Sequence, residues 1–198
     1  MWRSSNPQKL SSNVFALRSI ALRSFAALAS NEYDLAIIGG GPGGKTLFIA
    51  IFIGYVAAIK GAQKGLKTVC IEKRGTLGGT CLNVGCIPSK ALLYASHKFQ
   101  ESTHDLKELG IKVEDVKLDF KQFMKQKDQT VHGLTSGIEY LFKKNDVHYL
   151  KGWGRFSGKN EIEVDLLQGG KDKIKAKNII IATGSTSNFL PGNTIKVD

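Results

Sequence analysis

Short, unbroken apolar runs and stretches of helical spacing follow one another in the first half of this chain of 198 residues. The runs at 33–39 and 67–72 have the length and composition of buried strands. Pro88 suits the first turn of a helix that runs through residues 89–96. The pattern therefore predicts strands and helices in alternation.

The second half combines one long helical pattern with strand patterns. Residues 117–145 mix apolar and charged positions at helical spacing, which predicts one long helix. Residues 147–156 and 161–166 alternate like strands, and the Gly-Gly pair at 169–170 predicts a turn after them. The apolar run at 177–182 predicts a further strand of the buried type.

Basic residues outnumber acidic residues by 28 to 17, which gives a formal net charge of +11. The lysines after the first 31 residues are dispersed among acids and apolar positions, with no interleaved aromatic stripe. They therefore predict solvated faces rather than a surface for nucleic acid. The hydrophobic content of 42% is enough for one solid core.

Residues 1–31 form a basic, serine-rich start in which no acid precedes Glu32, and residues 14–28 can form a basic amphipathic helix. This segment resembles a mitochondrial transit peptide, with a disordered basic tail as the alternative. Residues 46–59 are uncharged and mostly apolar. They fall short of the ~20 residues that a membrane helix needs, so no membrane span is predicted.

Cys81 and Cys86 stand with four residues between them at the mouth of the helix that contains Pro88. A helix N-terminus and a nearby lysine, here Lys90, both stabilise a thiolate, so the pair predicts redox chemistry. The alternatives are a structural disulfide, half of a zinc site and two buried thiols. A zinc site needs about four ligands, and we predict no metal because the third cysteine, Cys70, lies in an apolar run typical of the core.

Glycines follow the first apolar run in two overlapping patterns. Gly39, Gly41 and Gly44 satisfy the dinucleotide-binding pattern G-x-G-x-x-G. The same loop with Lys45 and Thr46 satisfies the P-loop pattern G-x-x-x-x-G-K-[ST], in which lysine holds phosphates and threonine holds magnesium. The dinucleotide interpretation requires an acidic residue about 20 positions further on, at the end of the second strand.

Residues 78–90 resemble the active-site stretch of the flavin-dependent pyridine nucleotide-disulfide oxidoreductases. With Leu82, Ile87 and Ser89 the stretch is similar to the dihydrolipoamide dehydrogenase group, and glutathione and mercuric reductases usually differ there. The resemblance covers residues 32–193. It implies an α/β fold, a Rossmann-like FAD-binding domain with a central parallel sheet and a small antiparallel β meander.

The resemblance also identifies an insertion in this chain. In the family, the glycine loop runs directly into a helix that begins like Tyr55, whereas here residues 45–54 intervene. Glu72 closes the second apolar run 33 positions after Gly39, and without the ten residues it would follow by 23, which fits the dinucleotide pattern. Removing them also erases the P-loop match. Gly44 and Gly54 both remain candidates for the third glycine. If the insertion lengthened the helix at its N-terminus, it would add ~15 Å of helix and displace the original helix start from the loop.

Each role is carried over residue by residue from the resemblance. It implies that Cys81 and Cys86 form the redox disulfide, in which Cys86 contacts the flavin and Cys81 exchanges with a dithiol substrate. The matching FAD contacts are Gly39, Gly41, Gly44, Glu72, Lys73, Gly79, Thr80, Lys90, Gly154, Thr183, Gly184 and Ser185.

The implied activity is oxidation of protein-bound dihydrolipoamide with FAD as cofactor and NAD as acceptor. The implied partners are lipoyl domains of 2-oxoacid dehydrogenase and glycine cleavage complexes, in the mitochondrial matrix, with a homodimer in the whole enzyme. We expect residues 32–198 to be an incomplete FAD-binding domain, truncated before the NAD and dimerisation domains and inactive alone. The alternatives are a glutathione reductase-like enzyme, a P-loop nucleotide-binding protein through Gly39 to Thr46, and a truncated product without cofactor.

Overall fold

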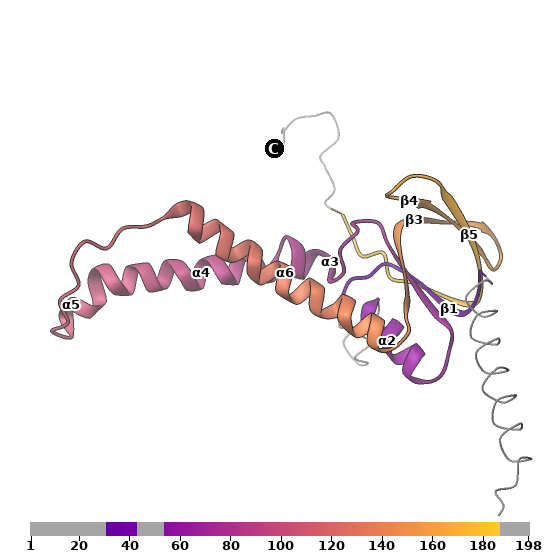
Figure 1. Ribbon diagram of the computed structural model, residues 1–198, viewed down its shortest axis with the longest axis horizontal. Helices are drawn as coiled ribbons and strands as arrows, with labels where there is room; N and C mark the ends of the chain where they lie inside the picture. Colours follow the sequence, from indigo (N-terminus) through magenta and orange to yellow (C-terminus); the bar gives the residue numbers. More distant parts are fainter. Residues whose placement is uncertain (1–30, 43–53, 187–198) are drawn as a thin grey trace, which may run out of the picture. The chain divides into compact units, whose positions relative to one another are not determined.

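The computed structural model describes residues 31–42 and 54–186. The strands are β1 (Glu32–Ile38), β2 (Thr68–Glu72), β3 (His148–Gly158), β4 (Glu161–Leu166) and β5 (Lys171–Ile181). The helices are α2 (Tyr55–Gln63), α3 (Gly79–Asn83), α4 (Cys86–Gln100), the π-helical turn η1 (Glu101–Asp105), α5 (Leu106–Glu108) and α6 (Phe120–Lys144) (Figure 1). The expected transit peptide, Gly44 and the insertion up to residue 53 lie outside the described residues.

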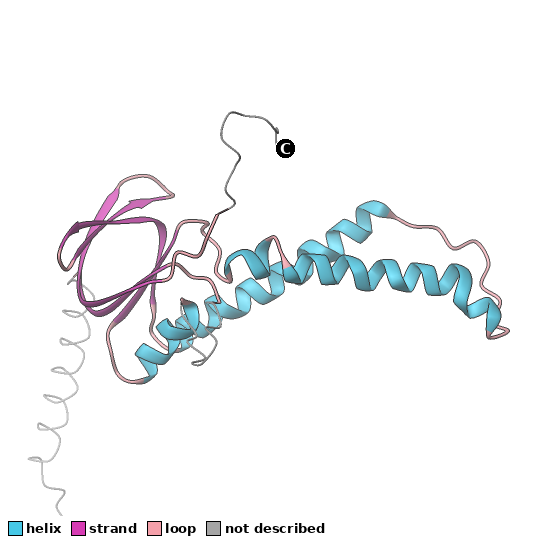
Figure 2. Ribbon diagram, turned by 180° about the vertical axis from the view of Figure 1, so that it is seen from behind, coloured by secondary structure: helices cyan, strands magenta, loops and turns pink. Residues whose placement is uncertain are grey.

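The five strands form one mixed sheet in the order β1-β2-β3-β4-β5, which closes into a barrel (Figure 2). β1, β2 and β3 are parallel, whereas β3, β4 and β5 are antiparallel. A central parallel sheet and a small antiparallel meander were both predicted, and here they form one continuous sheet. They are continuous because β3 and β5 have 11 residues each, long enough to belong to both parts.

β5 closes the sheet by running along β1 after it leaves β4. Its first residues, up to Lys175, pair with β4. Beyond them, the Asn178 side chain donates to the Asp34 carbonyl (3.2 Å), and the Ala182 N–H donates to the Ile38 carbonyl (2.8 Å). The expectation of a buried strand at 177–182 is wrong, since Lys177, Asn178 and Ile181 are exposed, Ile181 to 61%, and the other three residues are only partly buried. This part of β5 has left its neighbour β4.

Two hydrophobic clusters explain why the first two apolar runs are unbroken. One consists only of strand residues, among them Ala36 and Ile71, and fills the barrel. The other lies between the sheet and helices α2 and α6 and includes Ile37, Cys70 and Phe142. Alternate residues of one strand thus enter different clusters, and both faces are buried. Cys70 is confirmed as a core thiol, since it is fully buried and burial raises its pKa.

Helix α6 begins three residues later than predicted because Asp119 caps it. The Asp119 carboxylate accepts from the Gln122 N–H (3.0 Å), which satisfies one of the unpaired donors of the first turn. α6 packs against α4, as Figure 1 shows, and against α3, which carries Cys81. No helix in the described ranges is long and apolar enough to cross a membrane.

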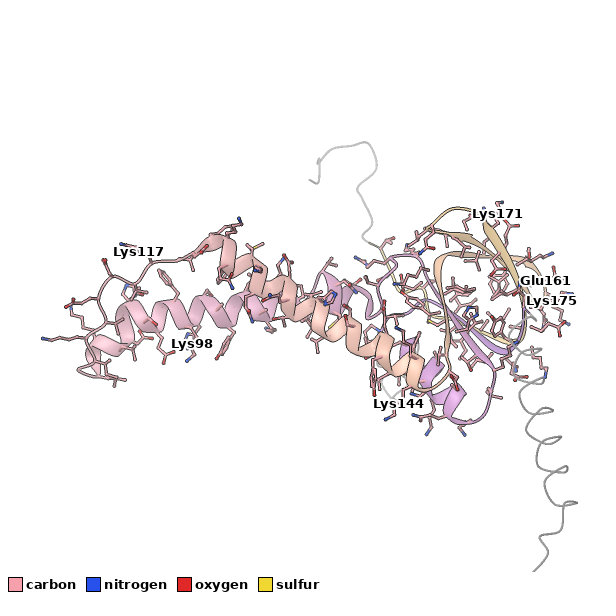
Figure 3. The ribbon with its side chains drawn as sticks, viewed as in Figure 1. Lys98, Lys117, Lys144, Glu161, Lys171 and Lys175 are labelled. Carbon is pink, nitrogen blue, oxygen red and sulfur yellow. The ribbon has the colours of Figure 1, made fainter. Side chains whose placement is uncertain are left out.

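Lysines on the outer face of the meander are paired with acids of the neighbouring strand. Glu161 lies 2.7 Å from Lys173 and 3.5 Å from Lys175, and Lys171 lies 2.7 Å from Glu163 (Figure 3). These pairs are exposed to solvent, which screens them, so each contributes little to stability. The lysines therefore alternate with carboxylates in space as well as in sequence.

Candidate functional site

A cavity of about 140 Å³ lies where β1 and β2 end. This volume is roughly ten times the 10–15 Å³ that one water molecule needs, so the cavity admits part of a small ligand. Its lining comes from four segments far apart in sequence. Five of the predicted cofactor contacts line it, namely Gly39, Glu72, Lys73, Gly154 and Thr183. Ligands of open α/β sheets bind at this carboxyl edge of parallel strands.

Gly39 occupies a position that no other residue fits. Its φ is +110°, and a Cβ atom there would lie 2.1 Å from the carbonyl oxygen of Ala182. Its N–H donates to the Ile71 carbonyl (2.8 Å). The glycine loop is therefore held between the ends of β2 and β5, with its backbone next to the cavity.

Gly54 packs on the same loop and opens helix α2. Its φ is +79°, and a Cβ atom there would lie 2.1 Å from the carbonyl oxygen of Gly41. The next residue, Tyr55, donates its N–H to that oxygen (3.2 Å). Of the two candidates for the third glycine, Gly54 lies against the loop, and Gly44 lies outside the described residues. The start of α2 thus stays beside the loop despite the ten extra residues.

Glu72 connects the end of β2 to the glycine loop. The side chain is 8% exposed, and its two oxygens accept from the N–H groups of Gly40 and Arg74, each at 2.8 Å. A carboxylate has about four lone-pair sites, so it can accept further hydrogen bonds from a ligand hydroxyl. The acid predicted at the end of the second strand is therefore at the cavity and oriented by the loop.

Trp153 is a cavity residue that the sequence patterns did not single out. It lies on β3 between Gly152 and Gly154, and its ring is 4.7 Å from the Lys73 ammonium group. Such a cation–π contact is worth ~0.5–1 kcal/mol at an exposed site. An aromatic residue between two glycines in a strand was the available signal.

The cysteine segment packs beside the glycine loop. The Gly78 N–H donates to the Gly40 carbonyl (2.8 Å), and a Cβ atom on Gly79 would lie 2.8 Å from the Gly41 Cα. Cys81 lies in α3, and Cys86 begins α4, as predicted for a residue at the helix mouth. Both are present as thiols, Cys81 half-buried and Cys86 exposed.

The other predicted contacts lie elsewhere. Among the described residues, Thr80, Lys90, Gly184 and Ser185 are exposed, and none of them lines the cavity. Within the same ranges, no group of three or more His, Cys, Asp or Glu side chains is arranged to hold a metal ion.

Labelling with iodoacetamide should distinguish the two thiols of the cysteine segment. The hydrogen bond with Cys86 raises the pKa of Cys81, with burial and the charge of Cys86 adding to the effect. A raised pKa keeps the thiol protonated, so labelling of Cys81 should rise only at a higher pH than that of an ordinary cysteine. In a Cys86→Ala variant, labelling of Cys81 should begin at a lower pH than in the original chain, as measured by peptide mass spectrometry. If Cys81 were labelled with the same pH dependence in both proteins, Cys86 would not be the cause of the raised pKa. Cys70, which is buried, should stay unlabelled and serves as the control.

The chain belongs to the pyridine nucleotide-disulphide oxidoreductase family, whose model matches residues 33–197. It is 56% identical over 173 residues to dihydrolipoyl dehydrogenase 1, mitochondrial, of Arabidopsis thaliana, covering 87% of this chain and 32% of that protein. It is 57% identical over 179 residues to the mitochondrial dihydrolipoyl dehydrogenase of Schizosaccharomyces pombe, with coverage of 89% and 33%. A leghemoglobin reductase of Vigna unguiculata is 56% identical over 175 residues, with coverage of 88% and 31%.

This chain therefore spans about a third of the length of these relatives. Among solved structures, an HOCl-induced flavoprotein disulfide reductase from Escherichia coli matches with a TM-score of 0.62 and 23% identity. That match covers 81% of this chain and 30% of the other. At this identity the likeness shows a shared α/β fold.

Proposed function

We propose that this chain is the FAD-binding part of a dihydrolipoyl dehydrogenase, with Cys81 and Cys86 as its redox disulfide. The main observation behind the proposal is that one cavity is lined by Gly39, Glu72, Lys73, Gly154 and Thr183. They come from four segments of the chain, and each was matched to an FAD contact from sequence. The identity of 50–57% to relatives named dihydrolipoyl dehydrogenase supports the same assignment.

The strand order supports a Rossmann-like domain. The parallel strands follow the order β3-β2-β1, and the end of β5 lies on the other side of β1. A dinucleotide-binding half has the order 3-2-1-4, with its phosphate loop after the first strand. β5 would then take the place of the fourth strand and bring Thr183 back to the glycine loop.

The residues present fit FAD. Without side chains at Gly39, Gly41 and Gly54, a pyrophosphate would be able to approach the backbone of the loop at the start of α2. Glu72 would accept from ribose hydroxyls, and the cavity beside Gly154 would take the adenine. Gly79, Thr80, Lys90, Gly184 and Ser185 would contact the remainder of the cofactor. This assignment leaves Lys45 and Thr46 without a P-loop role.

When bound, FAD supplies a two-electron acceptor that passes electrons on to NAD. The protein's own part is thiol–disulfide exchange. One thiolate of a dihydrolipoyl group attacks the Cys81 sulfur, the Cys81–Cys86 bond breaks, and Cys86 leaves as a thiolate. The second substrate thiolate then displaces Cys81, so the substrate becomes a disulfide and the protein holds two thiols. The partners would be lipoyl domains of 2-oxoacid dehydrogenase and glycine cleavage complexes in the mitochondrial matrix, and the whole enzyme would be a homodimer.

A flavin titration tests the proposal. We expect the chain to retain one FAD per molecule after gel filtration, and Glu72→Gln to weaken binding about tenfold, since it loses charge-assisted hydrogen bonds. Glu114→Gln, at an exposed position, is the matched control and should bind as the original chain does. A chain that retains no flavin, binds Mg-ATP and loses ATP on Lys45→Ala would instead be a P-loop protein.

A further inference from the structure

Asn83, the last residue of α3, uses its side-chain amide to hold the turn that precedes this helix. Its Nδ2 group donates to the carbonyl oxygens of Leu77 (3.0 Å) and Gly79 (2.9 Å). Its Oδ1 atom accepts from the Thr76 hydroxyl (2.8 Å). The end of the helix is thus bound by one hydrogen bond to its first residue, Gly79, and by two to the preceding turn.

The turn that Asn83 holds is the part of the cysteine segment that contacts the glycine loop. Leu77 is fully buried and anchors it in the core. Gly78 and Gly79 follow with φ of +99° and +58°, and Gly78 donates its N–H to the Gly40 carbonyl. A turn of two left-handed residues has several accessible conformations when unsupported, because glycine is conformationally permissive. The bonds from Asn83 select one of them.

Asn83 also stands between the two cysteines, two residues after Cys81 and three before Cys86. Helix α3 has only five residues, and so short a helix is marginal without side-chain support. If α3 frays, Cys81 moves relative to Cys86, which is fixed at the start of the 15-residue helix α4. The Asn83 amide is therefore placed to control the distance between the two sulfur atoms.

We propose that Asn83 is a positioning residue that keeps Cys81 and Cys86 close enough to form a disulfide beside the glycine loop. Its importance for dithiol oxidation rests on the proposed function. With oxidised glutathione as the oxidant, the two thiols lose two electrons and two protons, their S–S bond forms, and two molecules of reduced glutathione leave. When the two thiols are held close together, the effective concentration of one thiol at the other is high. Losing this preorganisation therefore lowers the equilibrium constant for formation of the disulfide.

The test equilibrates the 198-residue chain, without flavin, in buffers of reduced and oxidised glutathione and measures the trapped thiols by mass spectrometry. We expect Asn83→Ala to lower the equilibrium constant for the disulfide about tenfold, since three hydrogen bonds are lost. Thr76→Val, which removes one of them at an exposed position, should lower it about two- to threefold. Thr76→Ser keeps the hydroxyl and should behave as the original chain does.

An equilibrium constant unchanged in both Asn83→Ala and Thr76→Val, with a lower urea midpoint, would overturn the proposal and leave Asn83 a purely structural role. If Asn83→Ala does not fold, the comparison of Thr76→Val with Thr76→Ser decides the question alone. The equilibrium needs no cofactor. If the chain bound no FAD but the variants changed the disulfide equilibrium constant as expected, the role of Asn83 would therefore stand and the proposed function would be wrong.

Discussion

Replacing Gly39 by alanine is expected to abolish flavin retention and to destabilise the fold by about 3 kcal/mol or more. Two effects add. The φ of +110° is strained for any residue with a side chain, and the new Cβ would lie 2.1 Å from the Ala182 carbonyl oxygen. Relief requires that the loop move away from the end of β5, which opens the cavity. Urea unfolding and the flavin retained after gel filtration measure the two effects.

Gly137→Ala is the control for that substitution. Gly137 lies inside α6, is exposed, and has no atom within 4 Å of an added Cβ. Alanine there should raise the free energy of unfolding by ~0.5–1 kcal/mol, because glycine is the poorer helix former. Flavin retention should not change. If Gly39→Ala unfolded at the same urea concentration as Gly137→Ala and kept its flavin, the packing assigned to the glycine loop would be wrong.

Phe142→Ala is expected to lower the free energy of unfolding by about 3–5 kcal/mol. The ring is 2% exposed and belongs to the cluster between the sheet and the helices. It meets the Tyr149 ring edge-on, with centroids 5.8 Å apart, which anchors α6 to β3. Because α6 also packs against α3 and α4, the cysteine segment should lose support as well. Urea unfolding measures the loss, and iodoacetamide labelling reports the exposure of Cys81.

Phe120→Ala on the same helix is the matched control. Phe120 is 64% exposed and stacks only on Phe123, with centroids 6.2 Å apart, among the described residues. Its removal should change the free energy of unfolding by no more than ~0.5 kcal/mol, as for most surface substitutions. Equal losses in the two variants would mean that α6 is not held to the sheet through Phe142.

The elements could be predicted where a local pattern defines them. The alternating residues at 161–166 coincide with β4, and the helical spacing at 117–145 contains α6, whose start is moved by the Asp119 cap. The run at 33–39 was clear because the residues of β1 enter two different clusters and no polar residue follows Asp34 in the strand. Patterns of this kind depend on burial along one element and need no knowledge of the partner strand.

Closure of the sheet could not be predicted, because it depends on contacts between residues far apart in sequence. The run at 177–182 gave no indication that β5 begins at Lys171 and serves two neighbours, β4 and β1. The salt bridge between Lys177 and Asp34 (2.7 Å), 143 residues apart, is one of the contacts that fix this arrangement.

The candidate site was predicted to the extent that residues match a family pattern. Gly39, Glu72 and Gly154 were placed on one cavity, although their roles there remain proposals. The contact between Gly54 and the Gly41 carbonyl could not be predicted, because it depends on how the chain returns to the loop, which no sequence pattern specifies. Trp153 was missed because a lone aromatic residue in a strand is usually a packing residue.

The visible absorption spectrum of the purified chain, before and after one equivalent of dithiol per disulfide, reports both whether the chain binds FAD and whether its disulfide faces the flavin. We expect a flavin spectrum that develops a long-wavelength band after reduction, because Cys86 would face the flavin as a thiolate. Cys86→Ser should keep the flavin and lose the band. A colourless protein, or a flavin spectrum without the band, would contradict the assignment of this chain as an FAD-binding domain with a redox-active disulfide.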